Sequence, residues 1–354
     1  METQSAPSLV LTSDIPGRGG ASLTHISTNE NEIQILLACG ASREQAFDDF
    51  WVINIDRKTY TAQNCSRLKM KESDGFLPRN SMAGVYDQER DRVVFFGGQD
   101  PDNEHNDLYV LDLKTPELKH IDYLDGHIAP PPRNSHTLTL SSDGKSAYLF
   151  GGANSGGPLK DLYKLDLESL RFKQLKIIDS ECPLPQAEMH TCQLLNDNQL
   201  LVLGGRGIFA GQTLEQTACQ NSILSIDLSE GENQGKVSNF GALPADLCCH
   251  VSALVDNEFL ILYGGTNGLR FFDSVLRYSI KDKKWTLMTK IPPSCKSSRF
   301  FQDGRISSAS VQVAGECIVI FGGSSIENDC NDFLILPIAH LREDANFSEI
   351  NEIM

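Results

Sequence analysis

The chain has 354 residues, of which 40% are hydrophobic and 22% are charged, and its formal net charge is −16. This length suffices for one large domain or for two of ordinary size. The negative charge argues against nucleic acid and anionic membrane surfaces as partners. No apolar run approaches the roughly 20 residues that a membrane-spanning helix needs, so we expect no membrane insertion.

The N-terminal residues and the cysteines indicate the compartment. The start, METQSAPSLVLTSDIPG, lacks the basic residues and the long apolar stretch of a secretory signal. Ten cysteines are present without any CxxC pair, and in a long chain without a secretion signal they are expected to be reduced thiols. We therefore expect a cytoplasmic location, with the nucleus as an open alternative.

The first element pattern along the chain is an apolar run that ends in a degenerate glycine pair, ILLACGAS at 35–42. The pattern recurs as RVVFFGGQ at 92–99, AYLFGGA at 147–153, LLVLGGRG at 200–207, LILYGGTNG at 260–268 and CIVIFGGSS at 317–325. The first-glycine positions are 39, 97, 151, 204, 264 and 322, which are 53 to 60 residues apart. A period of this length predicts a repeat architecture.

Two further markers keep the same register in most copies. An aspartate follows the first glycine position by nine or ten residues and starts a second apolar run: Asp49, Asp107, Asp161, Asp273 and Asp332. An arginine precedes the glycine position by 17 to 21 residues: Arg18, Arg79, Arg133 and Arg305, with Ala187 and Leu247 in copies four and five. Alternating apolar residues and Gly/Asp/Asn punctuation indicate four short strands per copy, which we letter a to d.

These registered motifs resemble the Kelch repeat family over about residues 8–338. The resemblance implies an all-β, six-bladed propeller with four antiparallel strands per blade. We expect one propeller over residues 1–340 and an acidic tail, 341–354, outside the blades. The apolar stretch Leu9–Thr12 is expected to supply the last strand of blade six and so to close the ring without a free sheet edge.

The strand order predicts which loops share a face. Strands alternate in direction, so the b–c loops and the d–a connections lie on one face, which we call the loop face. Seven arginines belong to it: Arg18, Arg43, Arg79, Arg133, Arg206, Arg270 and Arg305. A guanidinium suits a carboxylate or a phosphate, which predicts a pocket for an acidic peptide, a phosphopeptide or a terminal carboxylate. In the alternative interpretation, the d–a arginines are repeat residues bound to loop carbonyls and to the b–c aspartates.

The candidate partner-binding residues follow from this face. They are Arg18, Arg79, Asn80, Arg133, Asn134, Arg206, Phe209, Arg270, Phe271 and Arg305. The two asparagines add hydrogen-bonding groups beside arginines. Phe209 lies in the least repeat-like segment, 206–221, and insertions in repeat proteins often mark the binding side. Phe271 belongs to the aromatic pair in GLRFFD, which is either a peptide contact or a cap on the blade.

Other motifs with chemical potential lack their required context. GGRGIFAG opens no helix of a nucleotide-binding unit, and SDGKS at 142–146 lacks the upstream glycine of a phosphate loop. His136, His190 and His250 occupy equivalent repeat positions, which favours a structural role over a metal site. Adjacent residues of a strand point to opposite faces, so Cys248, Cys249 and His250 are not expected to bind one ion. We expect no catalytic residue, metal or cofactor.

The resemblance also implies a function. Short Kelch-domain proteins are adaptors, scaffolds or substrate receptors, so we expect a non-catalytic protein–protein interaction module. Its partner is expected to be a protein or peptide with an acidic or carboxylate-bearing element. The alternative is an enzyme or an iron- or copper-dependent activity in the central channel.

Overall fold

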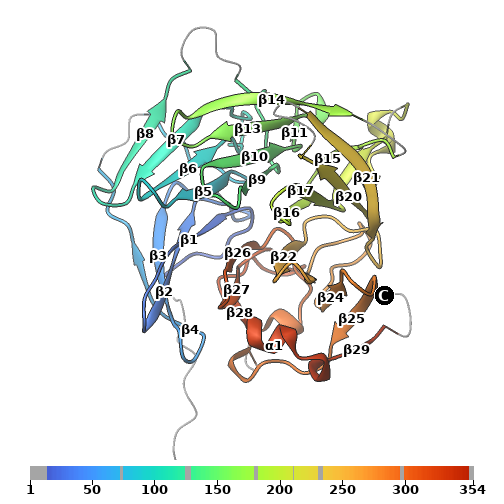
Figure 1. Cartoon of the computed structure of the whole chain (residues 1–354). Helices are drawn as coiled ribbons and strands as arrows, with labels where there is room; N and C mark the ends of the chain where they lie inside the picture. The colour runs from blue at the N-terminus through green and yellow to red at the C-terminus, as the bar shows by residue number, and fades with distance from the viewer. Residues whose placement is uncertain are drawn as a thin grey trace, which may run out of the picture.

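The computed structural model describes residues 14–71, 75–123, 129–178, 182–209, 211–229, 234–295 and 299–350. The chain is nearly all β, and its sheets stand around a central axis (Figure 1). Each of the six repeats forms one blade, so the expectation of a six-bladed propeller is confirmed. The strand predicted at Leu9–Thr12 lies outside the described residues.

The first two blades are four-stranded antiparallel sheets in the strand order of the sequence. Blade 1 contains β1 (Ser22–Thr28), β2 (Glu32–Ala38), β3 (Phe50–Asp56) and β4 (Thr61–Arg67). Blade 2 contains β5 (Ala83–Asp87), β6 (Arg92–Phe96), β7 (Leu108–Asp112) and β8 (Glu117–Ile121).

Blades 3 and 4 join at their outer edges. Blade 3 contains β9 (Thr137–Leu140), β10 (Ser146–Phe150), β13 (Leu162–Asp166) and β14 (Arg171–Ile178). Blade 4 contains β16 (Thr191–Leu195), β17 (Gln199–Leu203), β20 (Ser222–Asp227) and β21 (Gln234–Ala242). Parallel pairing of β14 with β21 merges both blades into one eight-stranded sheet.

Two small sheets lie in the loops of blades 3 and 4. One consists of β11 (Ala153–Asn154) and β12 (Gly157–Pro158). The other consists of β15 (Gln186–Glu188), β18 (Arg206–Ile208) and β19 (Ala218–Cys219). The second sheet organises the insertion that the sequence places after the glycine pair of blade 4.

Blade 5 has five strands, and the described part of blade 6 has three. Blade 5 contains β22 (Val251–Val255), β23 (Phe259–Tyr263), β24 (Val275–Ser279), β25 (Lys284–Met288) and β29 (Phe347–Glu349). Blade 6 contains β26 (Ala309–Val313), β27 (Cys317–Phe321) and β28 (Phe333–Pro337). The helical segments are α1 (Ile338–Arg342) and the 3₁₀ turns η1 (Leu214–Gln216), η2 (Pro293–Cys295), η3 (Arg299–Phe301) and η4 (Asp344–Asn346). Among the described residues, no helix has the length and apolarity needed to cross a membrane.

The apolar core lies between neighbouring blades. The b strands are buried on both faces because each blade packs against one neighbour on either side. In β6, for example, Val93 and Val94 point to opposite faces and both are fully buried. This two-sided burial explains why the b strands are continuous apolar runs, whereas the d strands are largely exposed.

The glycine pair forms the joint between successive blades. Gly151 has a φ of +60°, and a Cβ added there would lie 2.6 Å from the carbonyl oxygen of Ala187 in the next blade. The N–H of the adjacent Gly152 donates to that same carbonyl at 2.9 Å. Glycine is therefore required for both the left-handed backbone and the close approach. Cys39, which replaces the first glycine in copy one, adopts the same region with a φ of 59°.

The C-terminal segment does not lie outside the blades, so the expectation of a tail free of them is wrong for the described residues up to Ile350. After β28 the chain forms α1 and then returns to blade 5, where β29 pairs antiparallel with β25 (Figure 1). Arg277 of β24 anchors this return, because its guanidinium donates to the Leu341 carbonyl at 3.0 Å and stacks 4.1 Å from the Phe347 ring centroid.

Candidate partner-binding face

The b–c loops and the d–a connections do share one face, as the strand order predicted. In five blades, the residue that follows the arginine position of the d–a connection (Leu247 in copy five) forms a β-bridge with the residue that follows the glycine pair. These bridges are Gly19–Ala41, Asn80–Gln99, Asn134–Ala153, Cys248–Thr266 and Ile306–Ser324. In blade 4, the pairing of β15 with β18 makes the same connection. Each blade therefore presents its d–a connection and its b–c loop as one fastened unit.

The four d–a arginines are structural pins rather than exposed groups. Arg18, Arg79, Arg133 and Arg305 have at most 1% of their surface exposed. Each guanidinium bonds the b–c aspartate of its own blade, with shortest N–O distances of 2.5 to 2.7 Å. Each also donates to the carbonyl of the first-glycine position. The expectation that these four arginines form an open pocket is therefore wrong, and the alternative structural interpretation fits the geometry.

The environment of Asp49 favours its ionised form. Burial by itself raises the pKa of Asp49, but hydrogen bonds from Arg18 and Trp51 bring the pKa below its usual value. The Arg18 guanidinium also lies 3.9 Å from the Phe47 ring centroid. Asn134 is likewise buried, so it does not offer its amide to a partner, whereas Asn80 is only half-buried.

Copies four and five lack the pin, and their loop arginines are exposed. Arg206 reaches back to the buried Glu188, with N–O distances of 2.6 and 2.8 Å, yet half of its side chain remains exposed. Arg270 is exposed and lies over the ring of the buried Phe272 at 4.8 Å. Its neighbour Phe271 is half-buried and bridged to Thr266. Arg206 and Arg270 are thus the predicted partner-binding arginines that a partner can reach.

Arg43 is exposed but already engaged. It donates from its guanidinium to the carbonyls of Ser325 and Ile326 at 2.7 and 3.0 Å, and to the carbonyl of Glu327. Its backbone N–H donates to Asp329. This residue fastens the loops of blades 6 and 1 to one another.

Exposed apolar side chains concentrate on the loop face. Among the described residues, six large hydrophobic side chains are exposed, and five of them lie in b–c loops or d–a connections: Leu77, Phe209, Leu214, Leu269 and Ile326. Leu269 and Ile326 are 93% and 78% exposed. Of the five, only Phe209 is among the partner-binding residues that the sequence predicts. The others could have been recognised as bulky apolar residues inside Gly/Asn/Ser-rich loops.

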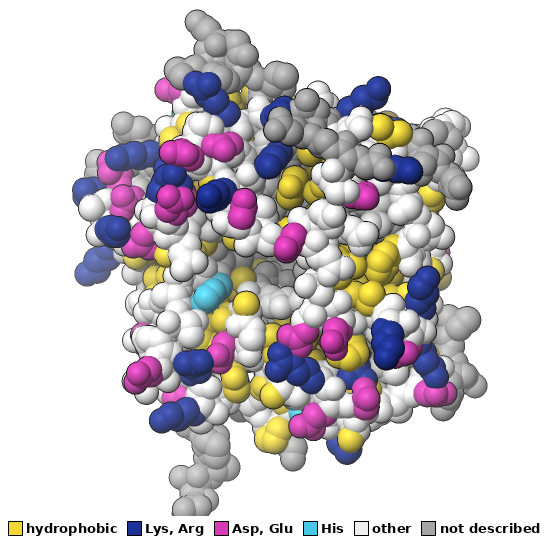
Figure 2. All heavy atoms as spheres, in the orientation of Figure 1, with side chains coloured by type: hydrophobic (Ala, Val, Ile, Leu, Met, Phe, Trp, Pro, Cys, Tyr) yellow, Lys and Arg dark blue, Asp and Glu magenta, His cyan; other side chains and the backbone are white. Residues whose placement is uncertain are grey.

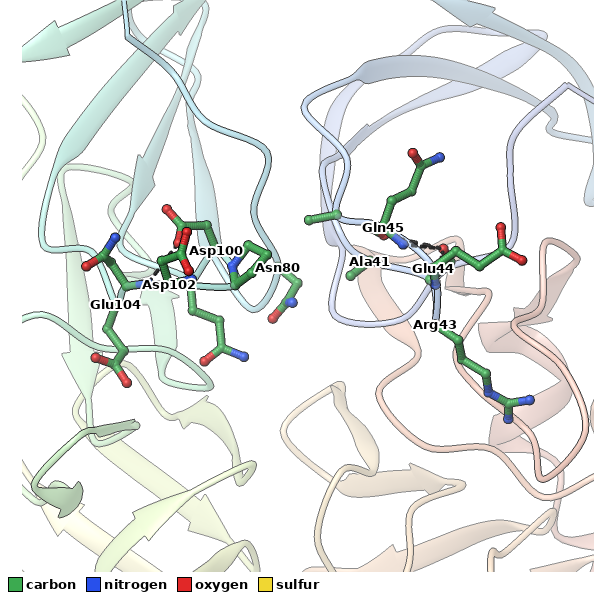
Figure 3. Close-up of a pocket in the computed structure, with 13 residues that line it drawn as sticks. Ala41, Arg43, Glu44, Gln45, Asn80, Asp100, Asp102 and Glu104 are labelled. Carbon is green, nitrogen blue, oxygen red and sulfur yellow. Dashed lines mark hydrogen bonds between the residues drawn. The ribbon is translucent and has the colours of Figure 1, made fainter.

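An acidic cleft opens between blades 1 and 2 on the same face. Its volume is about 370 Å³, and the b–c loops of both blades line it together with Asn80. Glu44 and Gln45 stand on one side and Asp100, Asp102 and Glu104 on the other, while Arg43 points away toward blade 6 (Figure 3). On the face that Figure 2 shows, side chains of both signs of charge are intermixed. The cleft therefore presents more negative than positive charge.

The three equivalent histidines are buried between blades. His136 packs edge-on to Phe96 and His190 edge-on to Phe150, with ring centroids 5.5 and 5.1 Å apart. His190 and His250 each lie within hydrogen-bonding distance of a threonine of the preceding blade, at 3.2 and 3.0 Å. In the described parts of the chain, no group of three His, Cys, Asp or Glu side chains is arranged to hold a metal ion.

Six repeated blades, glycine joints and Arg–Asp pins define a β-propeller of the repeat class. Comparison with known families identifies the repeat. Residues 20–207, more than half of the chain, match the KLHDC2/KLHL20/DRC7 Kelch-repeats domain, and residues 247–292 match the Kelch motif. The chain therefore belongs to the Kelch-repeat family, whose domains generally bind other proteins.

Individual relatives are distant and longer than the matched region. The chain is 28% identical over 244 residues to "Putative adagio-like protein 2" of Oryza sativa subsp. japonica. This alignment covers 66% of this chain and 36% of the rice protein. It is 26% identical over 255 residues to "Kelch domain-containing protein 10" of Xenopus tropicalis and of Homo sapiens. That match covers 71% of this chain and 58% and 54% of the two relatives.

Proposed function

We propose that this protein is a non-catalytic interaction module that binds a partner protein through its loop face. The observation that carries the proposal is the placement of the exposed apolar side chains, five of six of which lie on that face among the described residues. Apolar side chains at loop tips are exposed in the free protein and become buried when a partner covers them, and this burial favours binding. An adaptor, scaffold or substrate-receptor role in the cytoplasm is the context we propose for this binding.

The charges of the face suggest the sign of the partner's contacts. The cleft between blades 1 and 2 has Glu44, Asp102 and Glu104 at its edges, so it favours a cationic side chain of the partner. Over blades 4 and 5, Arg206 and Arg270 remain for the acidic or carboxylate-bearing element that the sequence predicted. We propose a partner segment that carries both signs of charge rather than an acidic one alone.

The test compares matched substitutions on the two faces. Leu269→Ser with Ile326→Ser removes two apolar loop tips, whereas Leu140→Ser removes the exposed leucine at the end of β9, next to the a–b turn of the opposite face. All three residues are exposed, so each variant should keep the melting temperature of the wild type. Partners captured by the wild type are identified by mass spectrometry, and their binding to each purified variant is then measured by calorimetry.

We expect the double variant to bind at least tenfold more weakly and Leu140→Ser to bind like the wild type. Equal binding by the double variant and the wild type would contradict the assignment of the loop face. The cleft is tested separately with the double variant Asp102→Lys with Glu104→Lys. We expect this variant to bind the partner more weakly than the wild type, because it repels the cationic side chain that the cleft favours.

A further inference from the structure

Three thiols meet at the base of the insertion in blade 4. Cys219, on β19, lies with its Sγ 3.4 Å from the Sγ of Cys248, which belongs to the connection between blades 4 and 5. The Sγ of the next residue, Cys249, lies 3.3 Å from the Sδ of Met189. The insertion and the inter-blade connection are thus in contact through sulfur atoms.

The two adjacent cysteines, Cys248 and Cys249, do not lie on a strand, which corrects the assumption of the sequence analysis about their geometry. Strand β22 begins only at Val251, and Cys249 has a left-handed φ of 56°. Interaction with the Cys249 thiol raises the pKa of Cys248. His250 instead faces Thr191 at 3.0 Å.

We propose that Cys219 and Cys248 are a redox-active dithiol that forms a disulfide and thereby fastens the insertion 206–221 to the connection between blades 4 and 5. The two sulfur atoms need to approach from 3.4 Å to the disulfide length of about 2.05 Å, which small side-chain rotations accomplish. Cys219 is partly exposed, so an oxidant can reach it, whereas Cys248 is buried directly behind it.

The chemistry balances with a low-molecular-weight disulfide such as oxidised glutathione as the oxidant. The Cys219 thiolate attacks one sulfur of the oxidant, forms a mixed disulfide and expels one glutathione thiolate. The glutathione thiolate expelled first takes the proton of the Cys248 thiol, whose sulfur then attacks the Cys219 sulfur and expels the second glutathione. The protein loses two protons and two electrons, and the oxidant leaves as two thiols.

The third thiol, that of Cys249, is itself the cysteine of the cluster whose pKa is lowered. The hydrogen bond from Cys248 lowers the pKa of Cys249, and the same hydrogen bond raises the pKa of Cys248. Cys249 is therefore the natural competitor of Cys219 for Cys248. A vicinal bond between Cys248 and Cys249 would leave the insertion unfastened, which makes Cys249 a control that separates the two pairings.

The consequence concerns the loop face and rests on the proposed function. Cys219 pairs across the small sheet with Arg206, and Cys248 is bridged to Thr266 in the b–c loop of blade 5. A disulfide would couple the insertion, which carries Phe209 and Leu214, to the loop that carries Leu269. Oxidation would then restrict the segment with which we expect the partner to make contact.

The experiment uses the purified full chain without any partner. The protein is equilibrated in buffers with rising ratios of oxidised to reduced glutathione, free thiols are alkylated, and the chain is digested with trypsin without reduction. The expected product links the peptide Gly207–Lys236, which contains Cys219, to the peptide Val237–Arg270, which contains Cys248 and Cys249. Cleavage by chymotrypsin after Phe209 and Leu214 is followed in parallel and should slow at least threefold on oxidation.

The variants decide the pairing. Cys219→Ser and Cys248→Ser should lose the linked peptide and the slower cleavage, whereas Cys249→Ser should keep both. A linked peptide that survives in Cys248→Ser, or its absence in the wild type at full oxidation, would overturn the dithiol. A bond that forms without slower cleavage would overturn the fastening of the insertion. None of these outcomes depends on a partner, so they are separate from a failure of the proposed function.

Discussion

At the scale of single residues, the buried arginines show how charge serves the scaffold. Arg133 donates to both carboxylate oxygens of Asp161 at 2.7 Å and to the Gly151 carbonyl at 2.9 Å. It also donates from Nε to the Pro131 carbonyl. Burying a guanidinium is costly unless its donors are satisfied, and here the b–c loop, the glycine joint and the d–a connection satisfy them together.

We therefore predict that Arg133→Ala destabilises the propeller by about 3 kcal/mol, because Asp161 and the Gly151 carbonyl lose their buried partner. Arg133→Lys keeps the charge but loses the bidentate contact with Asp161, so its stability should lie between that of the wild type and that of Arg133→Ala. Urea unfolding followed by fluorescence measures the change. Arg270→Ala is the control, since Arg270 is exposed and has no ion pair with a described residue; its stability should change by less than about 0.5 kcal/mol. Similar stability of the two alanine variants would contradict the role of the pin.

At the scale of elements, the C-terminal return to blade 5 covers an open edge. The register pairs Met288 with Phe347, Leu287 with Ser348 and Thr286 with Glu349. Without β29, strand β25 would present its outer backbone groups to solvent and would be open to pairing with other chains. The edge of blade 5 is thus protected by a segment that the repeat pattern does not contain.

Truncation tests this element. A chain that ends at Arg342 should fold but melt at a lower temperature. The amide hydrogens of Leu287 and Thr289 should exchange faster by more than tenfold, because Thr289 donates to the Asn346 carbonyl at 2.9 Å and the Leu287 N–H points to the same side of β25. A chain that ends at Ile350 keeps β29 and should behave like the wild type. Unchanged exchange in the shorter chain would show that β29 does not protect β25.

The repeat pattern predicted the blades well because each marker reports a local requirement. The glycine pair reports a left-handed backbone with no room for a side chain, and the continuous apolar runs report the two-sided burial of the b strands. The function of the arginines was mispredicted because sequence spacing does not show burial. The separation of 27 to 31 residues between each arginine and its aspartate was nevertheless a usable signal for pairing. The path of β29 was unpredictable, because it depends on Phe347 contacting Arg277 from a different repeat.

At the scale of the whole molecule, side chains fasten the seam between blades 6 and 1. Arg57 of blade 1 binds Glu316 of blade 6 through two N–O contacts of 2.5 and 3.0 Å. The N–H of Arg18 donates to the Cys330 carbonyl, and Asn331 donates to the Ile15 carbonyl at 3.2 Å. The chain thus enters blade 1 directly beside blade 6, where a preceding strand would meet the outer edge of β28.

Closure by the predicted strand Leu9–Thr12 is tested by two deletions. Removing residues 1–13 should lower the melting temperature by several degrees, because blade 6 would lose the expected fourth strand, whose hydrogen bonds would join the two ends of the chain in one sheet. Removing residues 1–7 leaves Leu9–Thr12 in place and should leave the melting temperature unchanged. Equal melting temperatures for both deletions and the wild type would show that closure relies on the side chains of the seam alone.

The three buried histidines make the stability of the ring depend on pH. Burial lowers the pKa of His136 to about 3, of His190 to about 4 and of His250 to about 3. In the unfolded chain a histidine titrates near pH 6.5, so below that pH the unfolded state binds more protons than the folded state, and stability falls as the pH falls. Between pH 7.5 and pH 5, each histidine should cost about 2 kcal/mol.

Thermal unfolding of the wild type and of His250→Gln over this pH range measures the effect. Glutamine does not titrate, so the variant should lose less stability than the wild type on acidification, even where it is less stable at pH 7.5. The difference between the two slopes isolates His250 from the other groups that titrate. Parallel curves for the wild type and the variant would mean that His250 binds a proton equally well in the folded and the unfolded chain, which would contradict its burial between blades.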